Sequence, residues 1–336
     1  MTPSLPSHSR SRPGPRPFDG LGGLDSTAQL MTRLSTQLQT QLRSVRAPRP
    51  ARVPRAQPPH APVLVAAAHG SRDPRALRTV EALVASVRAM RPGLHVALGH
   101  VELNEPLLSG TLAALPAGRQ AVVVPLLFGP GHHVDHDLPS AVADAPHVRA
   151  RIAQPLGPHP LLAAALHDRL REAGWRDAAA AGPAGGPQPA RCSPSDRPAV
   201  VLAAAGSRSP AAAAGAERTA RQLRESLGGG VPVVPAYASA ARPAVGEAVR
   251  ALQADGHAQV AVASCFTAPG YFASLCAAQS PWIAAAPIGA HPALAGLVLH
   301  RYDEARAAPA TAGSTPARAP SSAAPSVSVS AAAPAE

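Results

Sequence analysis

The sequence contains no lysine, few aromatic residues and only three cysteines. All 31 basic residues are arginine, and aromatic residues make up 3% of the 336 positions. Cys192, Cys265 and Cys276 are odd in number and lack Cys-X-X-Cys spacing. This excludes a disulfide framework and the usual Cys-based zinc or iron–sulfur sites. Unpaired cysteines are typical of a reducing compartment, so we expect a cytoplasmic protein.

Long apolar stretches are also missing, and the positive charge is unevenly spread. No run of 18 apolar residues occurs, so we expect no membrane span. The formal net charge is +11, but residues 1–60 alone hold nine arginines against two aspartates. Because this excess is confined to a tail, a nucleic-acid-binding fold is a poor explanation of the basic composition.

The length suggests about two domains, and an internal repeat supports that division. Four pairs of segments match in the same order, at offsets of 132–139 residues: AAAHGSRDP (66–74) with LAAAGSRSP (202–210), NEPLLSGTLAAL (104–115) with ARPAVGEAVRAL (241–252), VVVPLLFGPGHH (122–133) with AVASCFTAPGYF (261–272), and PLGPHPLLAAAL (155–166) with PIGAHPALAGLV (287–298). Matches at a nearly constant offset predict two homologous domains.

Composition sets the expected boundaries of these domains. Pro-, Arg-, Ala- and Ser-rich segments cannot bury enough apolar surface to offset the entropy of ordering the chain. The predicted parts are a disordered Arg/Pro-rich tail at 1–60, a first lobe at 61–176, a linker at 177–197, a second lobe at 198–306, and a disordered Ala/Pro/Ser-rich tail at 307–336.

Within the first lobe, short apolar runs alternate with helical segments. We predict strands at 63–68, 95–101, 121–128 and 149–155, and helices at 74–90, from 106, near 138–145 and after 160. This order predicts an α/β fold with a parallel sheet and helices on both faces. In such sheets, ligands bind beyond the carboxyl ends of the strands.

Metal-binding side chains follow three of these predicted strands. His69 ends the first strand and Glu102 ends the second, while His132 and His133 lie in the loop after the third. Two imidazoles and a carboxylate would therefore meet at one edge of the sheet. This set suits a borderline divalent metal. The residue pattern alone does not choose between His132 and His133.

The second repeat lacks every one of these candidate ligands. The aligned residues are Ala205 for His69, Ser239 for Glu102, Tyr271 for His132, Phe272 for His133 and Leu275 for His136. The Gly-Ser-Arg turn is kept, so Gly70 and Gly206 are expected to allow a tight backbone approach. His159 and His291 occur in both repeats within Gly-X-His-Pro, which favours a structural capping role.

Three segments of the first lobe resemble a known family. HGSRDP at 69–74, ELNEP at 102–106 and VVVPLLFGPGHHVDHDLP at 122–139 are similar to the CbiX/SirB-type sirohydrochlorin chelatases, which have the class II chelatase fold. The resemblance covers 61–175 and, more weakly, 198–305. It implies two tandem flavodoxin-like parallel-sheet lobes in one chain, which would form the cleft as a monomer.

The resemblance also implies roles for individual residues. Its metal ligands map onto His69, Glu102 and His133, and its catalytic residues onto His69 and His133. His136 matches a second histidine of the same loop and is a possible further ligand. His132 is another possible ligand, because it could exchange roles with His133.

The implied function is lyase-class metal insertion into sirohydrochlorin, a tetrapyrrole. The metal is a substrate, either Fe²⁺ for sirohaem or Co²⁺ for cobalamin, and no organic cofactor is expected. Neutral imidazole binds both ions and can accept a proton near pH 7. The expected partner is the tetrapyrrole, with neither nucleic acid nor membrane. Three alternatives stay open: a metal or tetrapyrrole carrier without insertion activity, a chelatase for another tetrapyrrole, and a nucleic-acid-associated protein that uses the Arg-rich tail.

The substrate ring carries many carboxylates, so arginines are expected in the cleft. Arg72, next to His69, is the first candidate, and Arg208 is its counterpart in the second repeat. An ion pair that supports the fold in both repeats is an alternative role for each. Tyr271 and Phe272 are expected to face the ring as a wall, leaving one metal site per chain.

Overall fold

The computed structural model describes residues 61–177 and 197–308. The predicted tail at 1–60 lies outside the described residues, as do the predicted linker at 177–197 apart from its two end residues and the predicted tail at 307–336 from residue 309 on. Position 307, predicted to begin that tail, is the last residue of the final helix. Within the described ranges, no helix combines the length and the apolar character needed to cross a bilayer.

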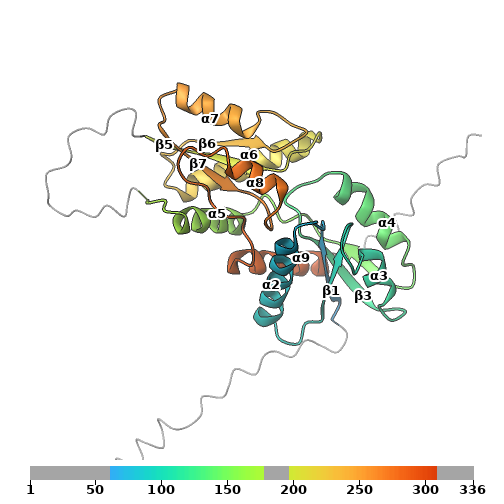
Figure 1. Ribbon diagram of the computed structural model, residues 1–336. Coiled ribbons are helices and arrows are strands. Elements are labelled where there is room, and N and C mark those ends of the chain that lie inside the picture. Colours follow the sequence, from blue (N-terminus) through green and yellow to red (C-terminus); the bar gives the residue numbers. More distant parts are fainter. Residues whose placement is uncertain (1–60, 178–196, 309–336) are drawn as a thin grey trace, which may run out of the picture. The chain divides into compact units, whose positions relative to one another are not determined.

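Across residues 61–177, four parallel strands alternate with helices (Figure 1). The strand order is β2-β1-β3-β4, and every residue of β1 is buried, as expected for a central strand covered on both faces. The elements are β1 (Val63–Ala68), α2 (Pro74–Met90), β2 (Val96–His100), α3 (Leu108–Ala113), β3 (Gln120–Pro125), the π-helical turn η1 (His133–Asp137), α4 (Leu138–Ala143), β4 (Arg149–Ile152) and α5 (Pro160–Glu172). The prediction of a parallel α/β lobe is confirmed.

Across residues 197–308, the second repeat forms a three-stranded parallel sheet with order β6-β5-β7. Where the first repeat has β4, the second has a single bridge between Val262 and Ala284. The elements are β5 (Pro198–Ala204), α6 (Pro210–Ser226), β6 (Val233–Tyr237), α7 (Val245–Ala254), β7 (Gln259–Ser264), α8 (Tyr271–Ala277) and α9 (Pro292–Ala307).

Local signals in the sequence explain where the helices begin. Asp73 accepts the backbone N–H of Arg75 at 2.9 Å, and the proline that follows Asp73 occupies the first turn of α2. His159 and His291 cap α5 and α9 in the same way. Each ring Nδ1 accepts the backbone N–H two residues further on, at 3.1 and 3.2 Å. The predicted capping role of both histidines is confirmed.

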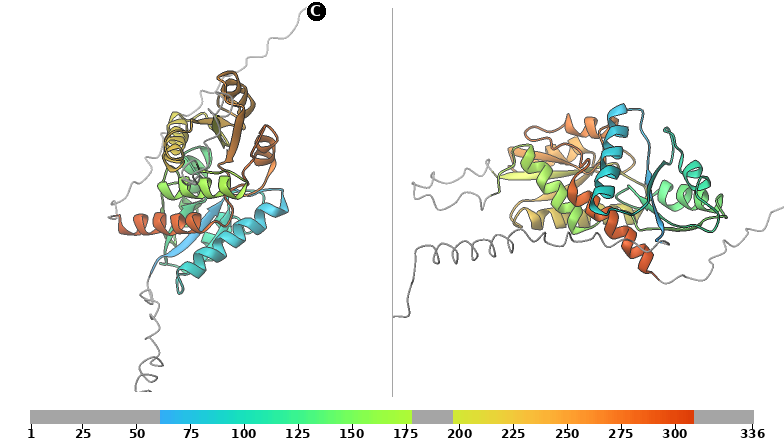
Figure 2. Two further views of the ribbon diagram at one scale, coloured as in Figure 1. Left: turned by 90° about the vertical axis from the view of Figure 1, so that its left-hand side faces the viewer. Right: turned by 90° about the horizontal axis from the view of Figure 1, so that it is seen from below.

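The last helix of each repeat packs on the sheet of the other repeat. Helix α9 contacts α2 and β3 of the first repeat, whereas α5 contacts α6 and β7 of the second. The two exchanged helices also contact each other, and Figure 2 shows them side by side, α5 in yellow-green and α9 in red. One buried apolar cluster therefore runs through both repeats and includes Leu64, Val124, Leu166, Leu202 and Tyr302.

Hydrogen bonds reinforce this exchange. The hydroxyl of Tyr302 in α9 donates to the carbonyl of Pro62, just before β1, at 2.7 Å. The guanidinium of Arg169 in α5 donates to the carbonyl of Ile288 at 2.7 and 3.0 Å. Because each sheet is covered by a helix from the other repeat, neither repeat buries its own sheet completely.

Candidate metal centre

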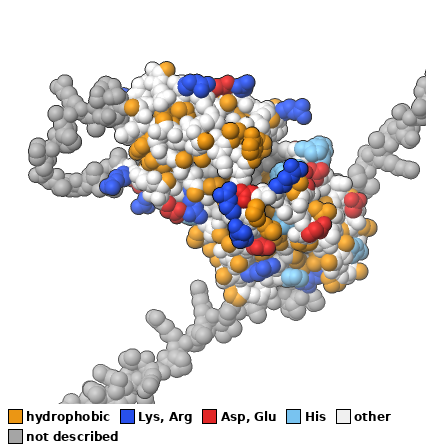
Figure 3. All heavy atoms as spheres, viewed as in Figure 1, with side chains coloured by type: hydrophobic (Ala, Val, Ile, Leu, Met, Phe, Trp, Pro, Cys, Tyr) orange, Lys and Arg blue, Asp and Glu red, His pale blue; other side chains and the backbone are white. Residues whose placement is uncertain are grey.

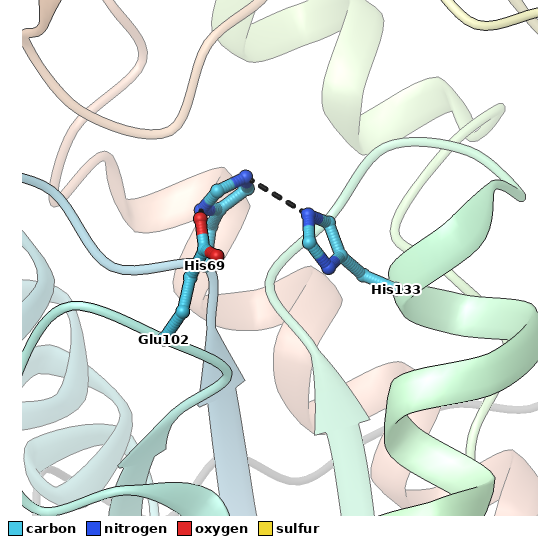
Figure 4. Close-up of side chains that lie close together, drawn as sticks. All are labelled: His69, Glu102 and His133. Carbon is cyan, nitrogen blue, oxygen red and sulfur yellow. Dashed lines mark hydrogen bonds and ion pairs between the residues drawn. The ribbon is translucent and has the colours of Figure 1, made fainter.

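Three side chains meet at the carboxyl edge of the first sheet. His69 follows β1 directly, Glu102 lies two residues beyond β2, and His133 opens η1 after β3. Each offers one ligand atom, and these atoms lie within 4.8 Å of one another. His133 Nε2 is 3.0 Å from His69 Nε2, and His69 Nδ1 is 3.4 Å from Glu102 Oε1 (Figure 4). The parallel sheet thus brings together residues that are up to 64 positions apart.

A close backbone contact fixes His69 and Glu102 relative to each other. The N–H of Glu102 donates to the carbonyl of His69 at 3.0 Å. Gly70 has a φ of +104°, and a Cβ there would lie 1.9 Å from the Glu102 carbonyl oxygen. Leu103 takes the left-handed region as well, with a φ of +66°. Only glycine fits at position 70, because any side chain would collide with the neighbouring strand end.

The second repeat has the same close backbone approach without the candidate ligands. Gly206 has a φ of +94°, and a Cβ there would lie 1.9 Å from the Ser239 carbonyl oxygen. Ser239 N donates to the carbonyl of Ala205 at 3.0 Å, and Ala240 has a φ of +57°. The predicted tight approach at both glycines is therefore confirmed, and it belongs to the fold rather than to the metal centre.

Side-chain hydrogen bonds brace the same turn. The N–H of Ser71 donates to Asn104 Oδ1 at 2.7 Å, and Ser71 Oγ accepts the N–H of Asp73 at 3.1 Å. Ser207 Oγ accepts the N–H of Ser209 at the same distance in the second repeat. Sequence reasoning did not single out Asn104, although its position two residues after Glu102 was the available signal.

The cluster is partly open to solvent. The side chains of His69, Glu102 and His133 are 46%, 48% and 29% exposed. Burial lowers the pKa of His69, the neighbouring His133 lowers it further, and Glu102 raises it. The neutral imidazole, which is the form that binds metals, is therefore favoured. Figure 3 shows histidine, acidic and arginine side chains close together at one exposed margin of the surface.

The structure separates His133 from the other histidines of its loop. The ring of His132 is exposed, and its centroid lies 6.2 Å from that of His133. It packs instead against His136, with ring centroids 4.9 Å apart. Neither His132 nor His136 joins His69 and Glu102 in the cluster. The geometry places His133, of the two adjacent histidines, at the strand-end cluster.

His133 has a second contact that sequence reasoning did not single out. Its Nδ1 lies 2.6 Å from Oδ2 of Asp137, four residues further along η1. The other carboxylate oxygen of Asp137 is 3.8 Å from His132 Nε2. The available signal was the His-X-X-X-Asp spacing, which places both residues on one side of a helical turn.

A cavity of about 1190 Å³ lies over the cluster and is lined by both repeats. It is larger than the ~300–1,000 Å³ of most small-molecule sites. The first repeat contributes His69, Glu102 and Phe128, and the second contributes Tyr271 and Phe272. The Tyr271 side chain is 77% exposed, and the two aromatic rings lie 5.6 Å apart. The cavity is therefore lined by the cluster from one repeat and by two adjacent aromatic residues from the other.

Two arginines lie at this cavity, one from each repeat. Arg72 and Arg208 both line it and are both exposed. Among the described residues, neither forms an ion pair of the kind seen for Arg91 with Asp303. In the described part of the chain, neither arginine therefore has the acidic partner that a fold-supporting ion pair would need.

Comparison with known protein families gives a match to each of the two repeats. A sequence model of the CbiX family matches residues 63–173 and 199–305. The chain belongs to the CbiX family. The two matched segments of this CbiX-family chain are its two α/β repeats.

Individual relatives match over shorter stretches. The chloroplastic sirohydrochlorin ferrochelatase of Arabidopsis thaliana is 32% identical over 109 residues, which are 31% of this chain and 48% of that protein. The sirohydrochlorin cobaltochelatase of Sulfurisphaera tokodaii is 32% identical over 79 residues, which are 23% of this chain and 66% of that protein. The chain thus spans about half to two thirds of the length of these relatives.

A solved structure extends the likeness of the CbiX-family chain to its whole fold. SirB from Bacillus subtilis with Fe³⁺ matches with a TM-score of 0.57, covering 73% of this chain and 95% of that one. At 22% identity, this likeness establishes the arrangement of the two lobes and nothing about individual residues.

Proposed function

We propose that this chain is a sirohydrochlorin chelatase, inserting Fe²⁺ or Co²⁺ into the tetrapyrrole ring. The observation that carries the proposal is the cluster of His69, Glu102 and His133, which lines a cavity of about 1190 Å³. The family membership and the names of the relatives support the same reaction class.

The ligand set suits a metal that must be released again. Two imidazoles and one carboxylate bind Fe²⁺ and Co²⁺ and leave coordination positions open for ring nitrogens. Glu102 supplies one negative charge, which offsets part of the charge of the ion. A cage of thiolates would hold the ion more firmly, and neither Cys265 nor Cys276, both buried, belongs to the cluster.

Insertion requires proton transfer as well as metal transfer. The entering M²⁺ forms bonds to the four ring nitrogens, and the two pyrrole N–H groups release two protons. Imidazole is a suitable acceptor near neutral pH. The Nε2 atoms of His69 and His133 lie 3.0 Å apart, which supports the proposal that these two imidazoles accept the protons once the ion has moved to the ring.

Ring recognition is shared between the repeats. Arg72 and Arg208 are proposed to bind ring carboxylates from the two sides of the cavity. Tyr271 and Phe272 occupy the positions aligned with His132 and His133, and both line the same cavity. Offset stacking against a planar ring suits such side chains.

The test is single-turnover metal insertion followed by the absorbance change of the ring. The full chain is mixed with sirohydrochlorin and either Fe²⁺ or Co²⁺ under anaerobic conditions. We expect acceleration over the protein-free reaction, and the ratio of the two rates identifies the preferred ion. The matched control is a variant with His69→Ala, Glu102→Gln and His133→Ala combined, which should accelerate neither reaction.

Two results would contradict this function. Stoichiometric binding of metal or ring without faster insertion would identify a carrier. Acceleration with another tetrapyrrole but not with sirohydrochlorin would reassign the substrate.

A further inference from the structure

His133 of η1 has a carboxylate next to the ring nitrogen that does not face His69. Asp137 Oδ2 lies 2.6 Å from His133 Nδ1, on the side of the ring away from His69. We propose that Asp137 is the positioning residue of the site, which holds the His133 ring and fixes its tautomer so that Nε2 faces the metal. The expected effect of Asp137 on metal insertion rests on the proposed function. The expected effect of Asp137 on metal binding does not depend on that function.

The tautomer follows from what each atom can donate. An ionised carboxylate only accepts hydrogen bonds, so the proton of the short contact belongs to His133 Nδ1. A neutral imidazole carries one proton, which leaves the lone pair on Nε2. That atom is the one 3.0 Å from His69 Nε2. A carboxylate behind a ligating histidine also makes the imidazole a better electron donor to the metal.

Asp137 has no competing structural task in the described part of the chain. It occupies the N-cap position of α4, where aspartate usually accepts a backbone N–H, but its side chain makes no such bond. Its other close contact is the 3.8 Å approach of His132 Nε2 to Oδ1. The carboxylate is thus directed at His133 instead of the helix end.

The second repeat lost both members of this pair. The residue aligned with His133 is Phe272, and the one aligned with Asp137 is Cys276. Cys276 is a buried thiol whose pKa is raised to about 11 by burial, so it carries no charge at neutral pH. The fold therefore tolerates an apolar residue and a neutral thiol at these positions, and the carboxylate occurs only where the histidine does.

The test combines metal affinity with the tautomer itself, in the full chain. Co²⁺ binding is measured by titration calorimetry without tetrapyrrole, and ¹⁵N shifts of the His133 ring are measured in metal-free protein. In Asp137→Asn, the amide can present its N–H₂ to Nδ1, which favours the wrong tautomer. We expect the ¹⁵N shifts to move toward the Nε2–H form, and Co²⁺ affinity to fall about 10- to 100-fold.

Asp135→Asn is the matched control, because it removes the same charge from an exposed residue of the same turn. It should leave both readouts unchanged. Asp137→Ala should weaken Co²⁺ binding as much as Asp137→Asn does, with circular dichroism melts like those of the unmodified chain. Retained affinity in both Asp137 variants, or an equal loss in Asp135→Asn, would overturn the positioning role. Asp137-dependent Co²⁺ binding in a chain that never accelerates insertion would uphold it and reject the proposed function.

Discussion

The two repeats share a backbone turn but not the side chains that it carries. In both repeats, a glycine with positive φ allows a close backbone contact between the end of the first strand and the loop after the second strand. In the first repeat the touching residues are His69 and Glu102, and in the second they are Ala205 and Ser239. The turn is therefore a requirement of the fold, whereas the candidate ligands His69 and Glu102 are side chains that the fold does not need.

The largest expected effect is the loss of a ligand from the first repeat. His69→Ala and His133→Ala should each lower the initial rate of Co²⁺ insertion by about 100-fold or more, the scale of a lost proton acceptor. Because Ala205 and Phe272 occupy the aligned positions, stability should change by at most about 1 kcal/mol. Initial rates and circular dichroism melts check both statements.

The control for these variants is Ser239→Ala, which changes the residue aligned with Glu102. It should leave the insertion rate within twofold of the unmodified chain. Near-normal rates in both histidine variants would reject the metal centre.

The next effect concerns the shared turn. Gly70→Ala and Gly206→Ala should each lower the free energy of unfolding by roughly 1–3 kcal/mol or more, because positive φ and the 1.9 Å approach disfavour any side chain. Urea unfolding measures the loss. Only Gly70→Ala should also displace Glu102 and weaken Co²⁺ binding. A large difference in stability between the two variants would show that the turns are not equivalent.

A smaller effect separates binding from chemistry. Arg72→Gln and Arg208→Gln should each raise the KM for the tetrapyrrole about two- to fivefold, the effect of a solvent-exposed ion pair of up to ~1 kcal/mol. The value of kcat should be nearly unchanged. Steady-state kinetics at saturating metal measure both constants. A KM that rises only in Arg72→Gln would remove the second repeat from substrate binding.

The smallest effect is a pH dependence common to both repeats. Burial lowers the pKa of His159. The nearby Arg301 and His300 lower this pKa further, and Glu304 partly opposes them. Burial likewise lowers the pKa of His291. The charge of Arg169 lowers this pKa further, and Asp168 and Glu172 partly oppose it. Below the ordinary value of about 6.5, the unfolded chain therefore binds these protons more readily than the folded one. The capping contribution should be complete above pH 6.5 and decline as the pH falls.

The measurement is the free energy of unfolding in urea at pH 7.5 and pH 5.5. His159→Asn and His291→Asn keep an N-cap acceptor that does not titrate. Each variant should lose less stability between the two pH values than the unmodified chain, by up to about 1 kcal/mol. An unchanged pH dependence in both variants would show that protonation of the caps costs nothing.

Much of the first repeat could be predicted from local signals. The predicted limits of β1 and α2 agree with the structure, because Asp73 and the following proline mark a helix start that few other residue pairs allow. The position of His69 and Glu102 at one sheet edge followed from the topology of parallel strands. Helix α3 begins at Leu108, slightly later than the expected start at 106.

Other features depend on contacts that no local pattern reveals. Helices α5 and α9 each present apolar residues that would suit either sheet, so the sequence does not tell which sheet each one covers. The choice of His133 over His132 depends on the π-helical turn, which rotates only one of two adjacent rings toward His69. The same turn brings Asp137 behind that ring.

The exchange of α5 and α9 also bears on how the chain folds. Tyr302 bonds to a carbonyl 240 positions earlier, so the first sheet is sealed only after nearly all the described chain has been synthesised. Contacts of such separation slow folding, since a large loop must close before they form. We expect the same contacts to couple the unfolding of the two sheets into one cooperative transition. Because each sheet is covered by the last helix of the other repeat, the second repeat is required to complete the first, even though it carries none of the aligned candidate ligands.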